Sequence, residues 1–391
     1  MPTPAPTIPP TRPLTRLGTL AVAEFMRGSW QRRPQLIRQA LRDFSAPLDA
    51  DALFALAARD DVESRLITAF NGRWRLRHGP LPARALPSRK RAGWTLLVQG
   101  VDLYLPAAAA LRERFRFISD ARLDDVMVSY ASDGGGVGPH VDSYDVFLLQ
   151  AQGRRRWRIS RQRDLDLVPG LPLKVLADFR ATHEWVLEPG DVLYLPPGVA
   201  HEGTALGADC ITCSIGFRAP AYRELVDPWL DAIAESAHGL DALRAQVHDP
   251  GKAPTRQPAA LPSAMVDAAL AQLNRMQPTR AHAEQALLAV LSEPKPIVTF
   301  DPPARPMTPA AFAAAAARRG VALDLRCRLL RAGVRIGING DVLALPAAER
   351  AAIARLADYR LLSAAQCRAL AQPVVERLHG WYVDGWLHLG T

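Results

Sequence analysis

The chain has 391 residues, a length that allows two or three domains. Hydrophobic residues make up 49% and charged residues 22%, as in a globular protein, and no run of eighteen apolar residues predicts a membrane-spanning helix. The formal net charge of +9 is compatible with a polyanion or with partners bound near one, and four cysteines are too few to indicate a disulfide framework.

The N-terminal part predicts a lead, helices and strands. Residues 1–18 are rich in proline and threonine and lack the apolar core of a secretion signal, so they predict a disordered lead and a cytoplasmic protein. Helical periodicity covers residues 20–44, divided by Pro34, and a short helix follows over Asp49–Arg59. A hairpin is expected over Arg65–Gly79 with Asn71–Gly72 as its turn. An apolar strand, a helix and a second strand come next, over Trp94–Gly100, Pro106–Arg114 and Val126–Ser132.

Three residues form a candidate metal site. His140 and Asp142 are two apart, so on a β-strand both side chains would point to the same face. A second apolar strand ends in a Pro196–Pro197 turn that is followed by His201. Two imidazoles and a carboxylate form the facial triad of non-haem Fe(II) oxygenases, which leaves positions open for a cosubstrate and O₂. A His-x-Asp pair alone is common in ordinary strands, and it is the third histidine that makes the set specific.

One arginine is predicted to face the metal. Asp145–Gln150 is an apolar strand, Gln152–Gly153 a two-residue turn, and Arg154–Ser160 the returning strand. In that register Arg155 and Trp157 share the face of His140 and Asp142, whereas the neighbouring arginines point to solvent. A buried guanidinium requires an anionic partner, which a dicarboxylate cosubstrate would supply. A bulge or a slip of one residue would reverse this assignment.

Four further residues are candidates for the cosubstrate and substrate sites. Ser129 is placed to border the cosubstrate, and Asp133 could take a cationic substrate side chain at the mouth. Tyr144 and Tyr194 could line the substrate channel, although buried tyrosines in a barrel usually pack and donate one hydrogen bond. For all four, an ordinary structural role is the simpler alternative.

Beyond Tyr222 the chain predicts helices and then a small C-terminal domain. Residues 222–292 contain amphipathic helices around a proline-rich connector at 249–263, and they either form a dimer interface or pack on their own barrel. Residues 305–391 resemble a winged helix. Its predicted helices and hairpins cover Pro309–Arg319, Val334–Leu345, Ala347–Tyr359, Ser363–His379 and Gly380–Leu389. The helix at Ser363–His379 carries few cations, which favours a structural or protein-contact role over DNA recognition.

Two long stretches resemble the bacterial Jumonji-C ribosomal oxygenases of the cupin superfamily. They are GGGVGPHVDSYDVFLLQAQGRRRWRIS at 134–160 and EPGDVLYLPPGVAHEG at 188–203, and FMRGSWQRRPQLIR at 25–38 and CSIGFRAP at 213–220 extend the likeness. The resemblance implies a mixed α and β fold with a double-stranded β-helix barrel over residues 19–221, including N-terminal helices. It implies Fe(II) and 2-oxoglutarate as cofactors, Arg155 on the distal carboxylate, and a homodimer through residues 222–292.

The resemblance also implies a function. It predicts a 2-oxoglutarate-dependent dioxygenase that hydroxylates an arginine of the sixteenth large-subunit ribosomal protein. Two alternatives stay open: the same core acting on a histidine or another residue of a different protein, and a metal-binding cupin serving as a nucleic-acid-binding regulator through its C-terminal domain. Neither a membrane nor nucleic acid is expected as a partner, except for nucleic acid near the ribosome.

Overall fold

The computed structural model describes residues 12–70, 73–237, 259 and 261–390. The predicted Asn71–Gly72 turn, most of the connector at 249–263 and the start of the lead lie outside them. The chain divides into two compact units. The first comprises residues 1–219, 295–326 and 358–391, and the second comprises residues 220–294 and 327–357. No helix in the described part of the chain has both the length and the apolar character to cross a membrane.

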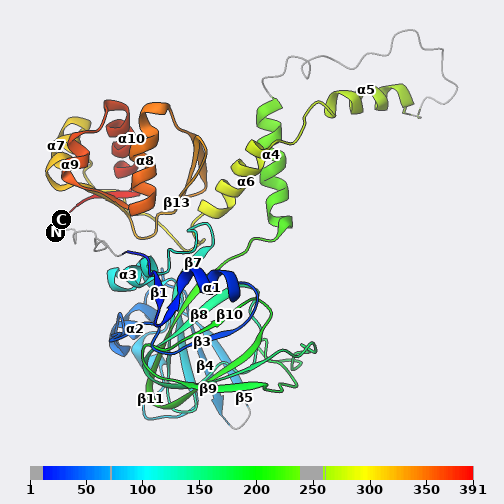
Figure 1. Cartoon of the computed structure of the whole chain (residues 1–391), viewed down its shortest axis with the longest axis vertical. Helices are drawn as coiled ribbons and strands as arrows, with labels where there is room; N and C mark the ends of the chain where they lie inside the picture. Colours follow the sequence, from blue (N-terminus) through cyan, green and yellow to red (C-terminus); the bar gives the residue numbers. More distant parts are fainter. Residues whose placement is uncertain (1–11, 71–72, 238–258, 260, 391) are drawn as a thin grey trace. The chain divides into compact units, whose positions relative to one another are not determined.

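The first unit is built on a nine-stranded sheet that curves into a cupin-type β-sandwich (Figure 1). Its order is β3-β10-β8-β11-β7-β6-β4-β5, and β9 pairs with β8. The strands are β3 (Gln35–Ile37), β4 (Ser64–Phe70), β5 (Arg73–His78), β6 (Trp94–Val98), β7 (Leu123–Ala131), β8 (Asp145–Ser160), β9 (His183–Leu187), β10 (Val192–Leu195) and β11 (Ala200–Phe217). A small pair, β1 (Arg16–Leu17) with β2 (Leu20–Ala21), precedes them.

Strand β8 is continuous where the sequence predicts a hairpin turn, so that prediction is wrong. Gln150 pairs with Thr212 and Gln152 pairs with Ile211, which leaves Ala151 as an extra residue in β8. Gly153, with φ +66°, continues the strand rather than reversing it. This β-bulge arises because β11 also makes an irregular excursion after Leu206, and the two long strands must stay paired on both sides of it.

The bulge shifts the alternation of side chains along β8 by one residue. Val146 and Leu148 therefore lie in one apolar cluster with Trp157 and Ile159, although their numbers differ in parity. Arg155 follows the parity of Trp157, so it shares the face that the sequence assigned to it. The predicted face is right, but a bulge produces it and a turn does not.

Helices pack around the outer face of the sandwich (Figure 1). They are α1 (Val22–Gly28), α2 (Ala50–Ala57), α3 (Pro106–Arg114) and the short turns η1 (Ala83–Ala85) and η2 (Val101–Leu103). Asp49 caps α2 by accepting a hydrogen bond from the Ala52 amide, and Phe25 and Leu53 are buried in the same core cluster.

Two N-terminal predictions are corrected by this packing. The helix expected over residues 20–44 ends at Gly28, and the part beyond Pro34 is strand β3, because its backbone pairs with β10 at Leu36 and Leu193. Residues assigned to the disordered lead are partly ordered, since Leu17 is fully buried in the core.

A buried ion network ties η2 to α3. The Arg112 guanidinium lies 2.9 Å from Asp102 Oδ2 and 3.3 Å from Glu113 Oε1. Asp102 also accepts a hydrogen bond from the Val126 amide, which joins the network to β7. Burial lowers the pKa of Arg112, but Asp102 and then Glu113 raise it further, so the net shift is upward. This arginine is fully charged and structural.

The C-terminal part of the first unit contains a three-stranded sheet in the order β16-β12-β17 with three helices. These elements are α7 (Pro309–Arg319), β12 (Val321–Leu323), β16 (Leu361–Leu362), α9 (Ala364–Arg368), α10 (Gln372–Val383) and β17 (Leu387–Leu389). The hairpin predicted over Gly380–Leu389 is wrong. Its first half continues α10, because Trp381 and Tyr382 are buried helix positions, and its second half pairs with β12.

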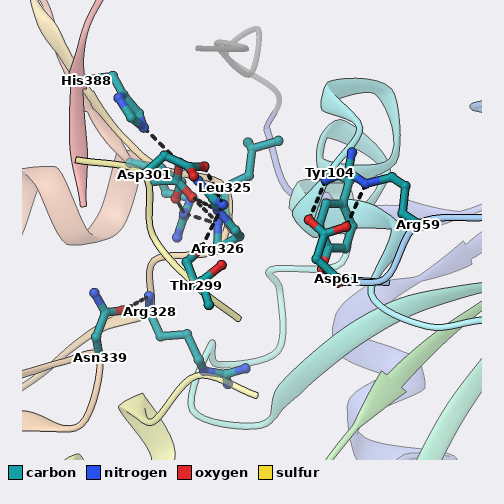
Figure 2. Close-up of polar contacts among 12 residues, drawn as sticks. Arg59, Asp61, Tyr104, Thr299, Asp301, Leu325, Arg326, Arg328, Asn339 and His388 are labelled. Carbon is teal, nitrogen blue, oxygen red and sulfur yellow. Dashed lines mark hydrogen bonds and ion pairs between the residues drawn. The ribbon is translucent and has the colours of Figure 1, made fainter. Parts of the chain in front are cut away.

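Polar contacts fix this sheet to the linker before it. Arg326 donates to Asp301 Oδ2 at 2.9 Å and to the Thr299 carbonyl at 2.8 Å. Figure 2 draws these residues and their contacts. Arg326 also pairs with Asp324, whose other oxygen lies 2.8 Å from His388 Nε2. These charges are neutralised locally, so they are structural.

The second unit packs helices on a three-stranded sheet. Its elements are η3 (Tyr222–Leu225), α4 (Val226–Ala237), α5 (Ser263–Leu273), α6 (Arg280–Ser292), β13 (Leu329–Ala332), β14 (Arg335–Ile338), β15 (Asp341–Ala344) and the start of α8 (Ala347–Tyr359). The predicted hairpin through Asn339–Gly340 is present, with positive φ at both residues. Gly337 lets α6 approach β14, since a Cβ there would lie 2.7 Å from the Leu288 carbonyl oxygen.

Candidate metal centre

Backbone pairing brings the two histidines together. His201 is the second residue of β11, and His140 lies in the irregular segment before β8. Each residue's amide donates to the other's carbonyl oxygen at 2.9 Å. Asp142 is held in the same way, because its carbonyl accepts from the Gly198 amide at 2.9 Å. The expectation that His140 and Asp142 sit on a regular strand is not met, but a bridge between two chain segments has the same effect.

The structure brings the three predicted ligands to one point. Their nearest ligand atoms all lie within 4.8 Å of one another. His201 Nε2 is 3.5 Å from Asp142 Oδ2, and His140 Nε2 is 3.9 Å from Asp142 Oδ1. Two nitrogens and one carboxylate on one side of a common point are the donor set that suits divalent iron and leaves other positions open.

Hydrogen bonds and burial set the protonation state that a metal requires. The Nδ1 of His140 lies 2.9 Å from the Gly138 carbonyl, and the Nδ1 of His201 lies 2.9 Å from that of Val199. Each Nδ1–H therefore donates to the backbone, and the lone pair of each Nε2 faces the centre. Burial, with the nearby His140, lowers the pKa of His201 to about 3, so this imidazole is neutral at physiological pH.

The carboxylate is tuned by its neighbours. Burial raises the pKa of Asp142, while His140, Arg65 and a hydrogen bond from Tyr144 act in the opposite direction. Arg65, on β4, thus lowers the pKa of Asp142, a role that the sequence did not predict. Its alternation with the buried Leu66 on β4 was the available signal.

Arg155 is a buried cation with open hydrogen-bonding positions. Arg155 is only 3% exposed, and its Nη2 donates to the Gly203 carbonyl at 3.2 Å. Its Nε and Nη1 are buried without a hydrogen-bond partner, and no carboxylate pairs with it in the part of the chain that is described. Burial lowers the pKa of Arg155, and Cys210 opposes this. A desolvated guanidinium with two free donors fits a carboxylate ligand.

Ser129 lies in a buried polar cluster that leads to Arg155. Its hydroxyl is 3.5 Å from the Thr212 carbonyl, and the Thr212 hydroxyl donates to Gln150 at 3.1 Å. The amide nitrogen of Gln150 lies 3.4 Å from the Cys210 sulfur, beside Arg155. The contributions of Thr212 and Cys210 were missed, because the irregular stretch of β11 hides which of its residues face inward.

Gly203 supports Arg155 and was also missed. A Cβ on Gly203 would meet Arg155 Nε at 2.6 Å and the Trp157 ring at 2.7 Å. The guanidinium and the indole therefore occupy the space that a side chain at residue 203 would fill. Since Gly203 follows His201 by two residues on β11, the parity of that strand was the available signal.

The residues proposed for the mouth have different fates. Asp133 is exposed, and its Oδ1 accepts a hydrogen bond from the Gly207 amide at 2.7 Å. Tyr144 is 38% exposed beside Asp142. The prediction for Tyr194 is wrong: it is fully buried, and its hydroxyl donates to Asp145 at 2.5 Å and accepts from the Gln31 amide. It packs on Phe25 and Phe147, because its neighbours Leu193 and Leu195 take the other face of β10.

Comparisons with known proteins agree with this architecture. The JmjC domain family matches residues 110–225, and the ROXA-like winged helix family matches residues 270–388. The Escherichia coli K12 protein named ribosomal protein uL16 3-hydroxylase is 34% identical over 348 residues, which is 88% of this chain and 91% of that protein.

Solved structures are similar over nearly the whole chain. An X-ray structure of E. coli YcfD has a TM-score of 0.82 at 31% identity and covers 96% of this chain and 99% of that one. A structure described as the ribosomal oxygenase YcfD in complex with cobalt and 2-oxoglutarate has a TM-score of 0.79 at 31% identity, with coverage of 95% and 99%. With these matches and this site, the chain belongs to the bacterial ribosomal oxygenases, which join a JmjC domain to a ROXA-like winged helix.

Proposed function

We propose that this chain is an Fe(II)- and 2-oxoglutarate-dependent hydroxylase of an arginine in the ribosomal protein uL16. The observation that carries the proposal is the pairing of two features in one barrel: a His-Asp-His cluster and, beside it, the unpaired buried guanidinium of Arg155. The relative named as a uL16 3-hydroxylase supports the substrate, and the YcfD structure with cobalt and 2-oxoglutarate supports the cofactors.

The residues present fit both cofactors. His140, Asp142 and His201 would hold iron, and the buried guanidinium of Arg155, whose Nε and Nη1 have no hydrogen-bond partner, would take the distal carboxylate of 2-oxoglutarate. Ser129 borders the same buried cluster. When bound, iron and 2-oxoglutarate supply the oxidising power that places one atom of O₂ in a substrate C–H bond and the other in succinate, with loss of CO₂. The protein's part is to orient the cosubstrate and keep water out.

Asp133 and Tyr144 are proposed to receive the substrate side chain. Asp133 uses only Oδ1 to hold the Gly207 amide, so Oδ2 can accept from a guanidinium. Tyr144 is partly exposed and contacts Asp142, which places its ring at the border of the metal centre. An exposed carboxylate and an aromatic ring suit an arginine side chain, whose charge and flat face both need a partner.

The second unit is proposed to form a homodimer. Its helices carry large apolar side chains that are about half exposed: Leu230, Val266, Leu270 and Leu273. Val266, Leu270 and Leu273 follow helical spacing along α5, and exposed apolar side chains of this kind favour a second copy of the chain as their cover. A ribosomal protein as substrate supports a cytoplasmic location.

The proposal is tested with the purified chain, Fe(II), 2-oxoglutarate and purified uL16. We expect succinate release and a mass gain of one oxygen atom on uL16, located at an arginine by fragmentation. His140→Ala is expected to lose both signals. His183→Ala, which removes an exposed histidine on β9, is the matched control and keeps them.

The alternatives give different results in the same experiment. Modification of a histidine, or of another ribosomal protein in preference to uL16, would favour the second hydroxylase hypothesis. Succinate release that survives in His140→Ala would falsify the metal assignment. A chain that neither releases succinate nor modifies any ribosomal protein, yet binds duplex DNA in a salt-dependent manner, would favour the regulator.

A further inference from the structure

Residues 64–101 form an unusually basic part of the chain. They contain eight lysines and arginines and no aspartate or glutamate. This stretch alone therefore carries a formal charge of +8, while the whole chain has a net charge of +9. The stretch covers β4, β5 and the segment that leads to β6.

Three of these cations lie in a row on an edge strand. β5 ends the sheet order, because it pairs only with β4 among the described strands. Arg73, Arg75 and Arg77 alternate along β5, so they share one face, and all three are exposed. Trp74 and Leu76 take the opposite face and are half-buried.

The segment after β5 adds further exposed cations close to this strand. Arg77 donates to the Ala85 carbonyl at 3.3 Å, which holds the segment against the strand. The guanidinium of Arg91 lies 4.0 Å from the centre of the Phe70 ring, and Phe70 is paired with Arg73. We call the exposed cations of β5 and of the segment after it the basic edge; they are Arg73, Arg75, Arg77, Arg84, Lys90 and Arg91.

Within the described part of the chain, the basic edge has no neutralising acid. None of its six cations forms an ion pair there, whereas their neighbour Arg89 pairs with Asp51. Charged side chains on an edge strand prevent aggregation, but alternating charges of either sign would do so equally well. Alternate residues of a strand are about 6.7 Å apart, so the arginines of β5 repel one another. A bound polyanion would remove that repulsion.

The position of the basic edge suggests which polyanion it meets. On the opposite face of β5, Trp74 packs against Gly138, where a Cβ would lie 3.1 Å from the indole, and Gly138 accepts the hydrogen bond of the ligand His140. The basic edge therefore lies on the strand whose other face borders the metal centre. Successive phosphates of one RNA strand have a spacing similar to that of alternate strand residues, and the ribosome presents such strands beside its proteins.

We propose that the basic edge binds the RNA phosphate backbone and thereby brings the metal centre to a substrate protein that lies on RNA. The ribosomal meaning of this contact rests on the proposed function, but RNA binding itself does not. The contact is electrostatic and independent of base sequence, because arginines in a row on an exposed strand read phosphates rather than bases.

The test measures the anisotropy of a fluorescein-labelled RNA duplex and of its single strand across a salt series, with the full-length chain. R73Q/R75Q/R77Q is compared with R275Q/R305Q/R318Q, which removes the same charge at exposed arginines elsewhere. For the wild type, we expect log affinity to fall linearly with log salt. The edge variant is expected to lower that slope by about 2–3, and the control by less than about 1.

Three results would overturn the proposal. The first is a wild type that shows no salt-dependent RNA binding. The second is an equal loss of RNA affinity in both triple variants, because the effect would then come from net charge alone. The third is an edge variant that keeps RNA binding but loses turnover of isolated uL16, because the edge would then contact the protein. Unchanged thermal unfolding of both variants shows that binding, and not folding, is affected. If the wild type fails to turn over uL16 but binds RNA through the edge, the proposed function fails and the RNA contact stands.

Discussion

Arg112 and Arg155 are both buried in the first unit, but their surroundings differ. Arg112 is enclosed by Asp102 and Glu113, and these carboxylates raise its pKa against the effect of burial. Arg155 is 3% exposed, has a backbone carbonyl as its hydrogen-bond acceptor, and has a pKa that burial lowers. A buried cation costs several kcal/mol unless an anion compensates it. The paired arginine therefore stabilises the fold, and the unpaired one is kept for a ligand.

Replacing Arg155 should give the largest effect on cosubstrate binding. Arg155→Met removes the partner of a buried carboxylate, a loss of about 2–5 kcal/mol, so the KM for 2-oxoglutarate should rise roughly 30- to 4,000-fold. Folding should not suffer, because an unpaired charge leaves the interior. Steady-state succinate release and urea unfolding measure the two quantities. A variant with an unchanged KM, or one that unfolds more easily by several kcal/mol, would remove the distinction between the two arginines.

Replacing Arg112 should have the reverse pattern. Arg112→Met leaves Asp102 as a buried carboxylate without its cation, while Glu113 keeps Arg116 at 2.8 Å. The free energy of unfolding should therefore fall by about 3–5 kcal/mol. The KM for 2-oxoglutarate should stay within about twofold of the wild type. The same urea and kinetic measurements apply. If Arg112→Met changed the KM as much as Arg155→Met does, the ion network would belong to the active site.

Adding one methyl group under Arg155 should give a smaller effect of the same kind. Gly203→Ala forces the guanidinium and Trp157 to shift, since both lie under 3 Å from the added Cβ. We expect a cost of about 1–3 kcal/mol, shared between stability and a higher KM for 2-oxoglutarate. Gly380→Ala is the control, because nothing lies within 4 Å of its Cβ and alanine favours α10 by up to about 1 kcal/mol. An unchanged KM for 2-oxoglutarate in Gly203→Ala would mean that the contact with Gly203 does not position Arg155.

The pH dependence of stability should show that Lys295 only partly offsets the cost of burying the Asp125 carboxylate. Burial raises its pKa to about 6, against the attraction of Lys295, which lies 2.6 Å away; Asp124 and Asp102 add to the rise. A carboxyl whose folded pKa exceeds its unfolded value stabilises the fold below about pH 4, and this contribution is lost as the pH rises through about 6. Between pH 4 and 7, the wild type should therefore lose up to about 3 kcal/mol more stability than Asp125→Asn. Urea unfolding at both pH values measures this, and parallel curves would contradict it.

The sequence predicted the metal site better than it predicted the strands that hold it. His140, Asp142 and His201 were identified from chemistry and spacing, although only a bridge between two irregular segments brings them together. Arg155 was assigned to the correct face by a hairpin that does not exist. Local pattern could not reveal the bulge at Ala151, because an extra residue is required only by the pairing of β8 with β11.

Errors at other positions have a tertiary cause. Leu36 and its neighbours show helical spacing, yet pairing with β10 makes them a strand. Tyr194 looked like a channel residue because its strand leads to the metal, but its hydroxyl has a buried partner in Asp145. For Tyr382, periodicity competed with a turn signal at Asp384–Gly385, and burial against α7 decided in favour of the helix. In each case a partner distant in the chain determined the structure.

The reciprocal amide bonds between His140 and His201 have a consequence for metal selection. Since peptide groups set the separation of the two imidazoles, the two histidine ligands are in position before a metal ion binds. A rigid set of two nitrogens and one carboxylate offers similar ligation to every first-row divalent ion, and copper or zinc would bind it more tightly than ferrous iron. The metal that binds in a cell thus depends on which free ions are available, and the enzyme's activity should follow the concentration of available ferrous iron.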